Sequence, residues 1–235
     1  NIKVVNLSMN SSVYQSYHTS PLAAACEILW FNSVVVVVSA GNNGTSTLYP
    51  PANDPFVITV GATDDKNTVD LADDLVTTFS AYGVDETGRV KPDLVAPGKN
   101  LIAFLPDVNA LTISQQYPQN QVNSYYFRMS GTSMAAPVVS GAVALLLQKA
   151  QETGVPLTPD QVKFRLMATA NKNWAGYDPA RAGAGLLDVF AALNSNTTES
   201  ADTGIYPSQL LTTGTDPITF GSVGWNSVGW NSVGW

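Results

Sequence analysis

The stretch SVVVVVSAGNNG, residues 33–44, constrains the fold of this chain more than any other segment. Five consecutive valines occupy positions 34–38 with no polar residue among them, and this pattern predicts a strand buried on both faces. Such strands belong to parallel sheets that are covered by helices, because each face of the sheet must be shielded from water. The glycine- and asparagine-rich chain that follows predicts a loop at the carboxyl end of this strand.

Strand and helix patterns alternate along most of the remaining chain. Helices are predicted after Ser20-Pro21 and Thr158-Pro159, because serine and threonine are good N-caps and proline suits the first helical position. We predict an α/β fold with three layers: a mostly parallel central sheet with helices on both faces. The other predicted strands are 2–8, 56–63 and 93–98, and the other predicted helices run from about 133 to 153 and over 183–194.

Composition excludes several classes of function. The net charge is −7 and no basic cluster is present, so neither nucleic acid nor an anionic membrane is a predicted partner. No membrane-spanning segment is predicted, because the longest apolar runs are strand-length. The single cysteine, Cys26, excludes an internal disulfide and is interpreted as a small apolar residue on a buried helix face.

Three regions are predicted along the chain: a domain over 1–193, a linker over 194–220 and a tail over 221–235. Because the chain begins inside an apparent strand without an initiator methionine, we expect a fragment that lacks its N-terminal part. The linker is polar and without periodicity. The tail repeats a tryptophan every five residues, which fits one face of neither a strand nor a helix, so it is predicted to be a low-complexity segment; a partner-binding role is the alternative.

Ser133 is the candidate nucleophile. It lies between small residues in SGTSMAAP, where a polar segment gives way to a long apolar helix. The free N–H groups at a helix N-terminus can stabilise a developing oxyanion, but a serine hydroxyl also needs a base to take its proton. From this segment alone, a simple helix-capping role for Ser133 is the favoured interpretation.

Several segments, in the right order, resemble the subtilisin-like serine proteases (subtilases, the peptidase S8 family). GTSMAAPVVSGAVALLL resembles the nucleophile segment, VVVVVSAGNNG the segment with the oxyanion asparagine, and VVNLSMN the strand that pairs with substrate. YPPANDPFVITVGAT, TFSAYG, KPDLVAPG and GAGLLDVFAAL match further family segments. The resemblance extends from about Val4 to Leu193 and identifies the chain as the C-terminal part of a subtilase catalytic domain.

The resemblance implies hydrolysis of peptide bonds through an acyl-enzyme. Ser133 would attack the carbonyl carbon, while the Asn42 side-chain amide and the Ser133 backbone N–H would hold the oxyanion. Ser8, Met9 and Asn10 on one side and Ala40-Gly41 on the other would flank the S1 pocket. The family usually has glycine at the position of Asn10, so the sequence does not determine the width of this pocket. Asn42 also fits a plain turn.

The general base is missing from the sequence. The family carries an aspartate in Asp-Thr/Ser-Gly and a histidine in His-Gly-Thr, both before the serine, and neither motif occurs here. The single histidine, His18, follows the Ser8 segment and is interpreted as a solvated loop residue. We therefore predict a serine endopeptidase whose isolated fragment is inactive. The alternative is a non-catalytic module, derived from a protease domain, that binds peptides or surfaces.

No cofactor or metal site is predicted. The acidic residues of the 64–74 segment lack the spacing of a calcium loop and are interpreted as a solvated loop, although structural calcium is possible in full-length family members. The acidic residues are Asp64, Asp65, Asp70, Asp73 and Asp74.

The segment 107–126 could form a rim of the cleft or a surface excursion. The resemblance further implies protein or peptide substrates and a secreted or cell-surface location, and it leaves the oligomeric state open.

Overall fold

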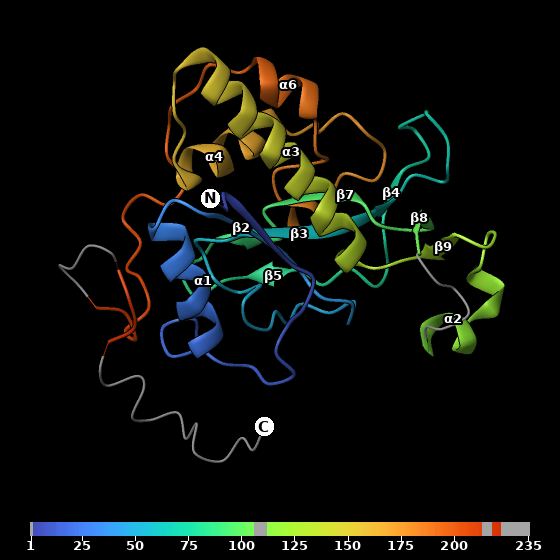
Figure 1. The fold of residues 1–235 in the computed structure, drawn as a ribbon, viewed down its shortest axis with the longest axis horizontal. Coiled ribbons are helices and arrows are strands. Elements are labelled where there is room, and N and C mark those ends of the chain that lie inside the picture. The colour runs from blue at the N-terminus through green and yellow to red at the C-terminus, as the bar shows by residue number, and fades with distance from the viewer. Residues whose placement is uncertain (1, 106–111, 213–217, 222–235) are drawn as a thin grey trace.

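A central sheet of five strands organises the structure, a computed structural model that describes residues 2–105, 112–212 and 218–221 (Figure 1). Three neighbouring strands are parallel and β7 adds a fourth parallel strand beside β3, whereas the short β4 pairs antiparallel with the end of β3. The tryptophan repeat at 222–235 lies outside the described residues. The strands are β1 (Val4–Leu7), β2 (Val35–Ser39), β3 (Ile58–Asp64), β4 (Leu75–Val76) and β7 (Leu94–Pro97).

The valine-rich segment forms β2, in which every residue is buried, as its pattern predicts. Helix α3 (Thr132–Thr153) crosses one face of the sheet and contacts β1, β2, β3 and β7. Helix α1 (Pro21–Phe31) lies against β2 on the opposite side of the sheet (Figure 1). The predicted three-layer α/β architecture is therefore confirmed.

The remaining elements surround this sheet. Two small antiparallel pairs, β5–β6 and β8–β9, form separate ribbons. Helices α4 and α6 pack against each other on the α3 side. Their bounds are β5 (Gly83–Val84), β6 (Val90–Lys91), β8 (Leu101–Phe104), β9 (Tyr126–Met129), α2 (Thr112–Gln116), the 3-10 helix η1 (Pro118–Asn120), α4 (Pro159–Thr169), α5 (Pro179–Ala182) and α6 (Val189–Asn194).

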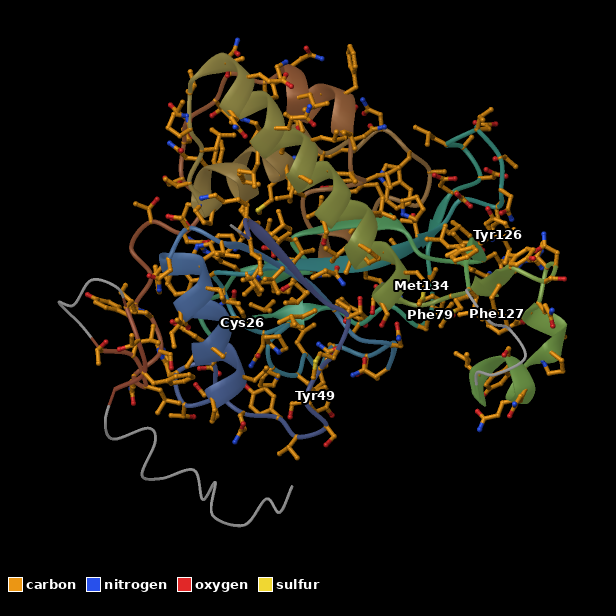
Figure 2. All side chains as sticks on the ribbon, in the orientation of Figure 1. Cys26, Tyr49, Phe79, Tyr126, Phe127 and Met134 are labelled. Carbon is orange, nitrogen blue, oxygen red and sulfur yellow. The ribbon has the colours of Figure 1, made fainter. Side chains whose placement is uncertain are left out.

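The predicted helix starts carry the expected caps. The Ser20 side chain accepts a hydrogen bond from the Ala23 N–H at the start of α1. Thr158 and Gln161 form a complete capping box at α4, in which each side chain accepts from the other residue's backbone N–H. Cys26 lies on the buried face of α1, and burial raises the pKa of its thiol (Figure 2).

Helix α3 is the one helix of the described residues that is long and apolar enough to cross a membrane by length and composition, although no such span was predicted. One of its faces packs on the sheet, where Val139 and Leu146 are buried. The opposite face is apolar but exposed, and Leu145 keeps 47% of its surface accessible. Strand β1, which α3 also contacts, pairs with β2 alone among the described residues.

The segment after α6, predicted as a linker, is in contact with the body of the structure over its first part. Asp202 is buried and forms ion pairs with Lys163 of α4 at 3.0 Å and with Arg89 at 2.6 Å. Further along, the Ser208 N–H donates to the carboxylate of Glu27 on α1. Residues 195–212 therefore follow the surface from α4 to α1.

Two buried carboxyl groups carry strongly raised pKa values. Burial, followed by repulsion from Asp54, raises the pKa of Glu27 to about 9. Burial likewise raises the pKa of Asp54 to about 7, although the Phe56 N–H and the nearby Lys91 oppose the increase. Unfolding exposes both groups to water and returns each pKa toward its ordinary acidic range, so unfolding releases protons above that range. The contribution of these two groups to the free energy of unfolding therefore falls as the pH rises from about 4 toward 9.

Replacing Glu27 with glutamine tests this linkage. Glu27→Gln keeps an oxygen for the Ser208 N–H but removes the ionisable group, so the variant should lose less stability as the pH rises. A fully shifted group contributes a slope of at most about 1.4 kcal/mol per pH unit. Urea unfolding at pH 5, 7 and 9 measures the difference. Equal slopes for the two proteins would show that Glu27 is not protonated in the folded state.

Candidate active site

Ser133 lies in the first turn of α3, directly after the turn that leaves β9. Gly131 precedes the helix with φ of 156°, a conformation that favours glycine. As one of the first helical residues, Ser133 has no intrahelical acceptor for its N–H group. Its hydroxyl lies 3.4 Å from the backbone oxygen of Ser8, and the Ser8 hydroxyl donates to the Ser133 carbonyl at 2.8 Å. The nucleophile candidate is thus beside the end of β1.

Asn42 lies in the loop after β2, with its amide turned toward the start of α3. Its Oδ1 accepts hydrogen bonds from the N–H of Thr132 at 2.9 Å and from the Thr132 hydroxyl at 3.0 Å. These two bonds fix the amide plane, and Nδ2 donates to no described residue. A Cβ on Gly131 would lie 3.3 Å from Nδ2, so glycine at this position leaves room for the amide. The structure therefore holds a free amide donor next to Ser133.

Thr132 has a positioning role that the sequence analysis did not assign. It is fully buried, and its hydroxyl also accepts a hydrogen bond from the Gly41 N–H at 3.1 Å. Through these contacts Thr132 joins the carboxyl end of β2 to the N-terminus of α3. Thr132 belongs to the same GTS motif as Ser133, so the sequence pointed to this position. Only the structure shows what the Thr132 side chain contacts.

The residues assigned to the S1 walls come together because β1 and β2 are parallel neighbours and end at the same edge of the sheet. The Asn10 amide donates to the Ser39 carbonyl at 2.9 Å, and the Ser39 hydroxyl donates back to Asn10 Oδ1 at 3.4 Å. A Cβ on Gly41 would lie 3.6 Å from Asn10 Oδ1. The Asn10 side chain therefore spans the gap between the two segments, 8–10 and 40–41. Met9 is 55% exposed.

His18 is placed away from this arrangement. Its ring packs on Tyr17, with centroids 4.0 Å apart, and its backbone oxygen accepts from the Gln209 N–H and the Ser208 hydroxyl. Its Nδ1 is buried without a hydrogen-bond partner among the described residues. No described contact joins His18 to Ser133. Since the chain has one histidine, the described structure offers Ser133 no imidazole base.

The acidic loop is held by lysines. Asp64 accepts hydrogen bonds from Lys66 at 2.7 Å and Lys99 at 2.6 Å. Partial burial acts to raise its pKa, but these hydrogen bonds outweigh that effect and lower it to about 2. Across the described part of the chain, no three His, Cys, Asp or Glu side chains are grouped closely enough to hold a metal ion.

The β8–β9 ribbon and helix α2 project from the body near the start of α3 (Figures 1 and 2). Phe127 of β9 is buried, whereas its neighbour Tyr126 is 43% exposed, as expected for alternating faces of a strand. Phe104 and Tyr125 add exposed aromatic rings that stack at 6.4 Å. Of the predicted excursion over 107–126, residues 107–111 lie outside the described residues.

The chain belongs to the subtilase family, whose sequence profile matches residues 1–218. It is 39% identical to the serine protease AprX of Bacillus subtilis (strain 168) over 192 residues, which cover 80% of this chain and 42% of AprX. It is 35% identical to the thermophilic serine proteinase of Bacillus sp. (strain AK1), covering 61% of this chain and 28% of the relative. A third relative, the extracellular basic protease of Dichelobacter nodosus, is 32% identical over 162 residues, which cover 68% of this chain and 23% of that protease.

Solved structures of proteases have the same fold. The prenylagaramide maturation protease PagA matches with a TM-score of 0.62 and 28% identity, over 81% of this chain and 60% of PagA. The patellamide maturation protease PatA matches with a TM-score of 0.59 and 28% identity, over 81% of this chain and 61% of PatA. This chain thus spans less than half the length of the three sequence relatives. The predicted family and fold are confirmed, whereas the roles of individual site residues stay predictions.

The Thr132 contacts generate a stability prediction. Thr132→Val keeps the shape of the buried side chain but leaves the Gly41 N–H without its acceptor and Asn42 Oδ1 with one donor fewer. Leaving such groups unpaired typically costs about 1–3 kcal/mol, which urea unfolding measures. Thr132→Ser retains the hydroxyl and is the matched control. Equal stability of Thr132→Val and the unmodified chain would contradict the assigned role.

Proposed function

We propose that this chain is part of a serine endopeptidase that cleaves protein or peptide substrates through an acyl-enzyme on Ser133. One observation carries the proposal: Ser133 lies at the N-terminus of α3 beside an asparagine amide whose orientation Thr132 fixes. Membership of the subtilase family and the protease names of the relatives support the reaction class.

The proposed chemistry uses two hydrogen-bond donors. Ser133 Oγ attacks the carbonyl carbon of the scissile bond, and its proton passes to a general base and then to the leaving amine. Negative charge develops on the carbonyl oxygen, which accepts from Asn42 Nδ2 and from the Ser133 N–H. Water then cleaves the acyl-enzyme and releases the second product. The donors need no reorientation during the reaction, because the Asn42 amide is already held by Thr132.

The substrate would lie between the ends of β1 and β2. Segments 8–10 and 40–41 form the walls proposed for the S1 pocket, and Asn10 reaches across between them. This side chain reduces the space at the position where the family usually has glycine. We therefore propose that the pocket favours smaller side chains before the scissile bond.

We further propose that the aspartate and histidine of the triad lie outside residues 1–235. Two features support this placement: β1 has a free edge among the described residues, and the outward face of α3 is apolar and exposed. The end of β1 and the start of α3 meet at Ser133, so further chain packed along these two elements would reach the nucleophile. An extracellular location is also proposed, supported by the similarity to the extracellular basic protease.

The 235-residue chain alone should therefore be inactive. Without a base, the Ser133 hydroxyl stays protonated, so hydrolysis of a fluorescently labelled casein should not exceed that of the Ser133→Ala control. Hydrolysis that Ser133→Ala abolishes would contradict this prediction. In that case His18→Ala would test whether the single histidine is the base.

In a form extended upstream of residue 1 to include the aspartate and histidine motifs, Asn42→Ala should lower kcat by about 10²–10³-fold, because one oxyanion donor is lost. KM should change little, since the donor acts mainly on the transition state. Asn43→Ala, in the same loop, is the matched control. An unchanged kcat for Asn42→Ala would remove Asn42 from the proposed mechanism.

The alternative function is a non-catalytic module that binds extended peptides. The observation that favours it is the lack of a base near Ser133 in the described structure. A fluorophosphonate probe distinguishes the two functions: labelling of the extended form that disappears in Ser133→Ala establishes the enzyme. Absence of labelling, combined with peptide binding, establishes the binding module.

A further inference from the structure

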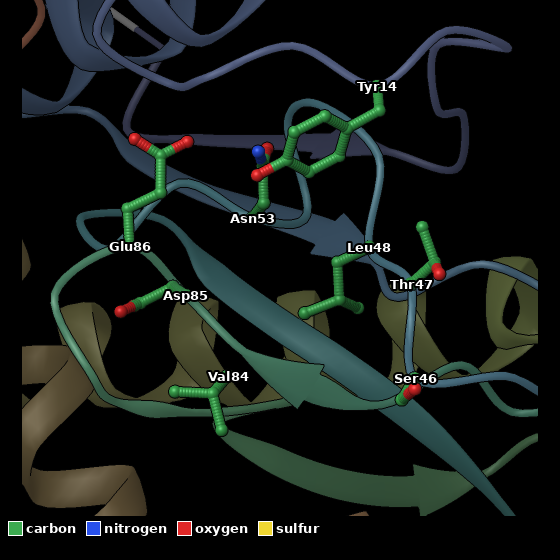
Figure 3. Close-up of a pocket in the computed structure, with 8 residues that line it drawn as sticks. All are labelled: Tyr14, Ser46, Thr47, Leu48, Asn53, Val84, Asp85 and Glu86. Carbon is green, nitrogen blue, oxygen red and sulfur yellow. The ribbon is translucent and has the colours of Figure 1, made fainter.

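A pocket of about 200 Å³ lies on the α1 side of the sheet (Figure 3). Four separate stretches of chain form it: the loop before α1, the loop after Asn42, the chain leading to β3, and the β5–β6 ribbon. Pockets for drug-sized ligands usually measure about 300–1,000 Å³, so this pocket matches the end of a single side chain. The lining residues are Tyr14, Ser46, Thr47, Leu48, Asn53, Val84, Asp85 and Glu86.

Two buried oxygen atoms of the lining residues have no hydrogen-bond partner in the described part of the chain. Asn53 is 3% exposed, and its Nδ2 donates to the Gln15 carbonyl at 2.8 Å, which fixes the amide and leaves Oδ1 unpaired. Asp85 is 6% exposed, and its Oδ1 accepts from the N–H groups of Thr87 and Arg89, whereas its Oδ2 is unpaired. A buried acceptor without a donor is unfavourable, so both atoms favour a ligand that supplies N–H donors.

The pocket carries two carboxylates that no described cationic side chain neutralises. Glu86 is exposed and accepts a hydrogen bond from the Ser16 hydroxyl at 2.6 Å. Neither Asp85 nor Glu86 takes part in any ion pair among the described residues, and the buried Lys91 pairs with Asp93 instead. The described residues also lack a group of three acidic, histidine or cysteine side chains that could hold a metal ion. The pocket therefore favours an organic cation that donates hydrogen bonds.

Apolar surfaces complete the walls of the pocket. Leu48 is buried, whereas Val84 and the Tyr14 ring are exposed at the surface. In Figure 3 the polar ends of Tyr14, Asn53 and Glu86 lie toward one end of the pocket, and Leu48 and Val84 lie toward the other. A suitable ligand group thus has hydrogen-bond donors along its edge and a flat face without donors.

We propose that this pocket binds the guanidinium group of an arginine side chain that belongs to a polypeptide. A guanidinium is planar and always charged, and its five N–H donors match acceptors on several walls. Its flat face packs against aromatic and apolar side chains, which Tyr14 and Leu48 supply here. A lysine ammonium group has three donors and is more strongly hydrated, so its transfer into a narrow pocket is less favourable.

Both segments proposed to hold substrate continue into this pocket. Tyr14 follows Asn10 by four positions, and Ser46 follows Asn42 by four positions. A preference for arginine-containing substrates follows, and this consequence rests on the proposed function. The binding of arginine itself requires no activity from Ser133, so failure to bind arginine and failure to cleave peptides are separate outcomes.

Titration of the 235-residue chain with blocked tripeptides tests the proposal. A glycine–arginine–glycine peptide with both ends blocked should bind with a Kd on the order of 1 mM, as expected for one anchored side chain. Binding should shift the NMR signals of the Asn53 side-chain amide, which lines the pocket. The matching citrulline peptide has the same shape without the charge and should bind at least about tenfold more weakly. The matching lysine peptide should also bind more weakly than the arginine peptide.

Two variants with the same chemical change locate the binding. Glu86→Gln keeps an oxygen for the Ser16 hydroxyl but removes one charge, and it should weaken arginine binding about tenfold. Glu199→Gln makes the same change outside the pocket and should bind like the unmodified chain. Both glutamates are exposed, so both variants should fold.

Three results would each overturn the proposal. The first is equal binding of the arginine and citrulline peptides. The second is an arginine titration that leaves the Asn53 amide signals unshifted, which would mean that water alone occupies the pocket. The third is undiminished arginine binding by Glu86→Gln.

Discussion

The hydrogen bonds of Thr132 connect the two parts of this structure on which the proposed chemistry depends. The carboxyl end of β2 carries Gly41 and Asn42, and the N-terminus of α3 carries Ser133. Thr132 contacts both Gly41 and Asn42 from the first turn of α3. Because Thr132 is fully buried, these contacts are shielded from water, and the amide of Asn42 has one orientation. The position of Ser133 relative to that amide follows from the packing of α3 on the sheet.

A second set of contacts anchors the chain that follows α6. Lys91 and Lys163 are fully buried, and their ammonium groups donate to backbone carbonyls before β3 as well as to carboxylates. Lys163 pairs with Asp93 and Asp202, so α4, the residue before β7 and the 195–212 segment meet at one charge cluster. Buried charges are costly unless each has partners, and here every ammonium group has several. This cluster explains why residues after α6 lie against the domain despite their polar composition.

The framework was predictable from the sequence because it depends on local patterns. The valine run determines β2, and Ser20-Pro21 and the Thr158–Gln161 box determine where α1 and α4 begin. The family segments also identified Ser133 and Asn42, and the structure brings these residues together. The sequence also argued against His18 as the base, since it follows the Ser8 segment and has no His-Gly-Thr context.

Other features depend on contacts between distant residues and so had no local signal. The polar segment after α6 was predicted as a linker because no periodicity shows that Asp202 meets Lys163, 39 positions away. The role of Thr132 depends on Gly41, 91 positions away.

The proposed mechanism requires that Ser133 and the Asn42 amide act on the same substrate oxygen. A crystal structure of the upstream-extended form, reacted with a peptidyl phosphonate, measures this most directly. We predict a covalent bond from Ser133 Oγ to phosphorus, with a phosphonyl oxygen about 2.7–3.1 Å from Asn42 Nδ2. An adduct on another residue, or a phosphonyl oxygen directed away from Asn42, would contradict this mechanism.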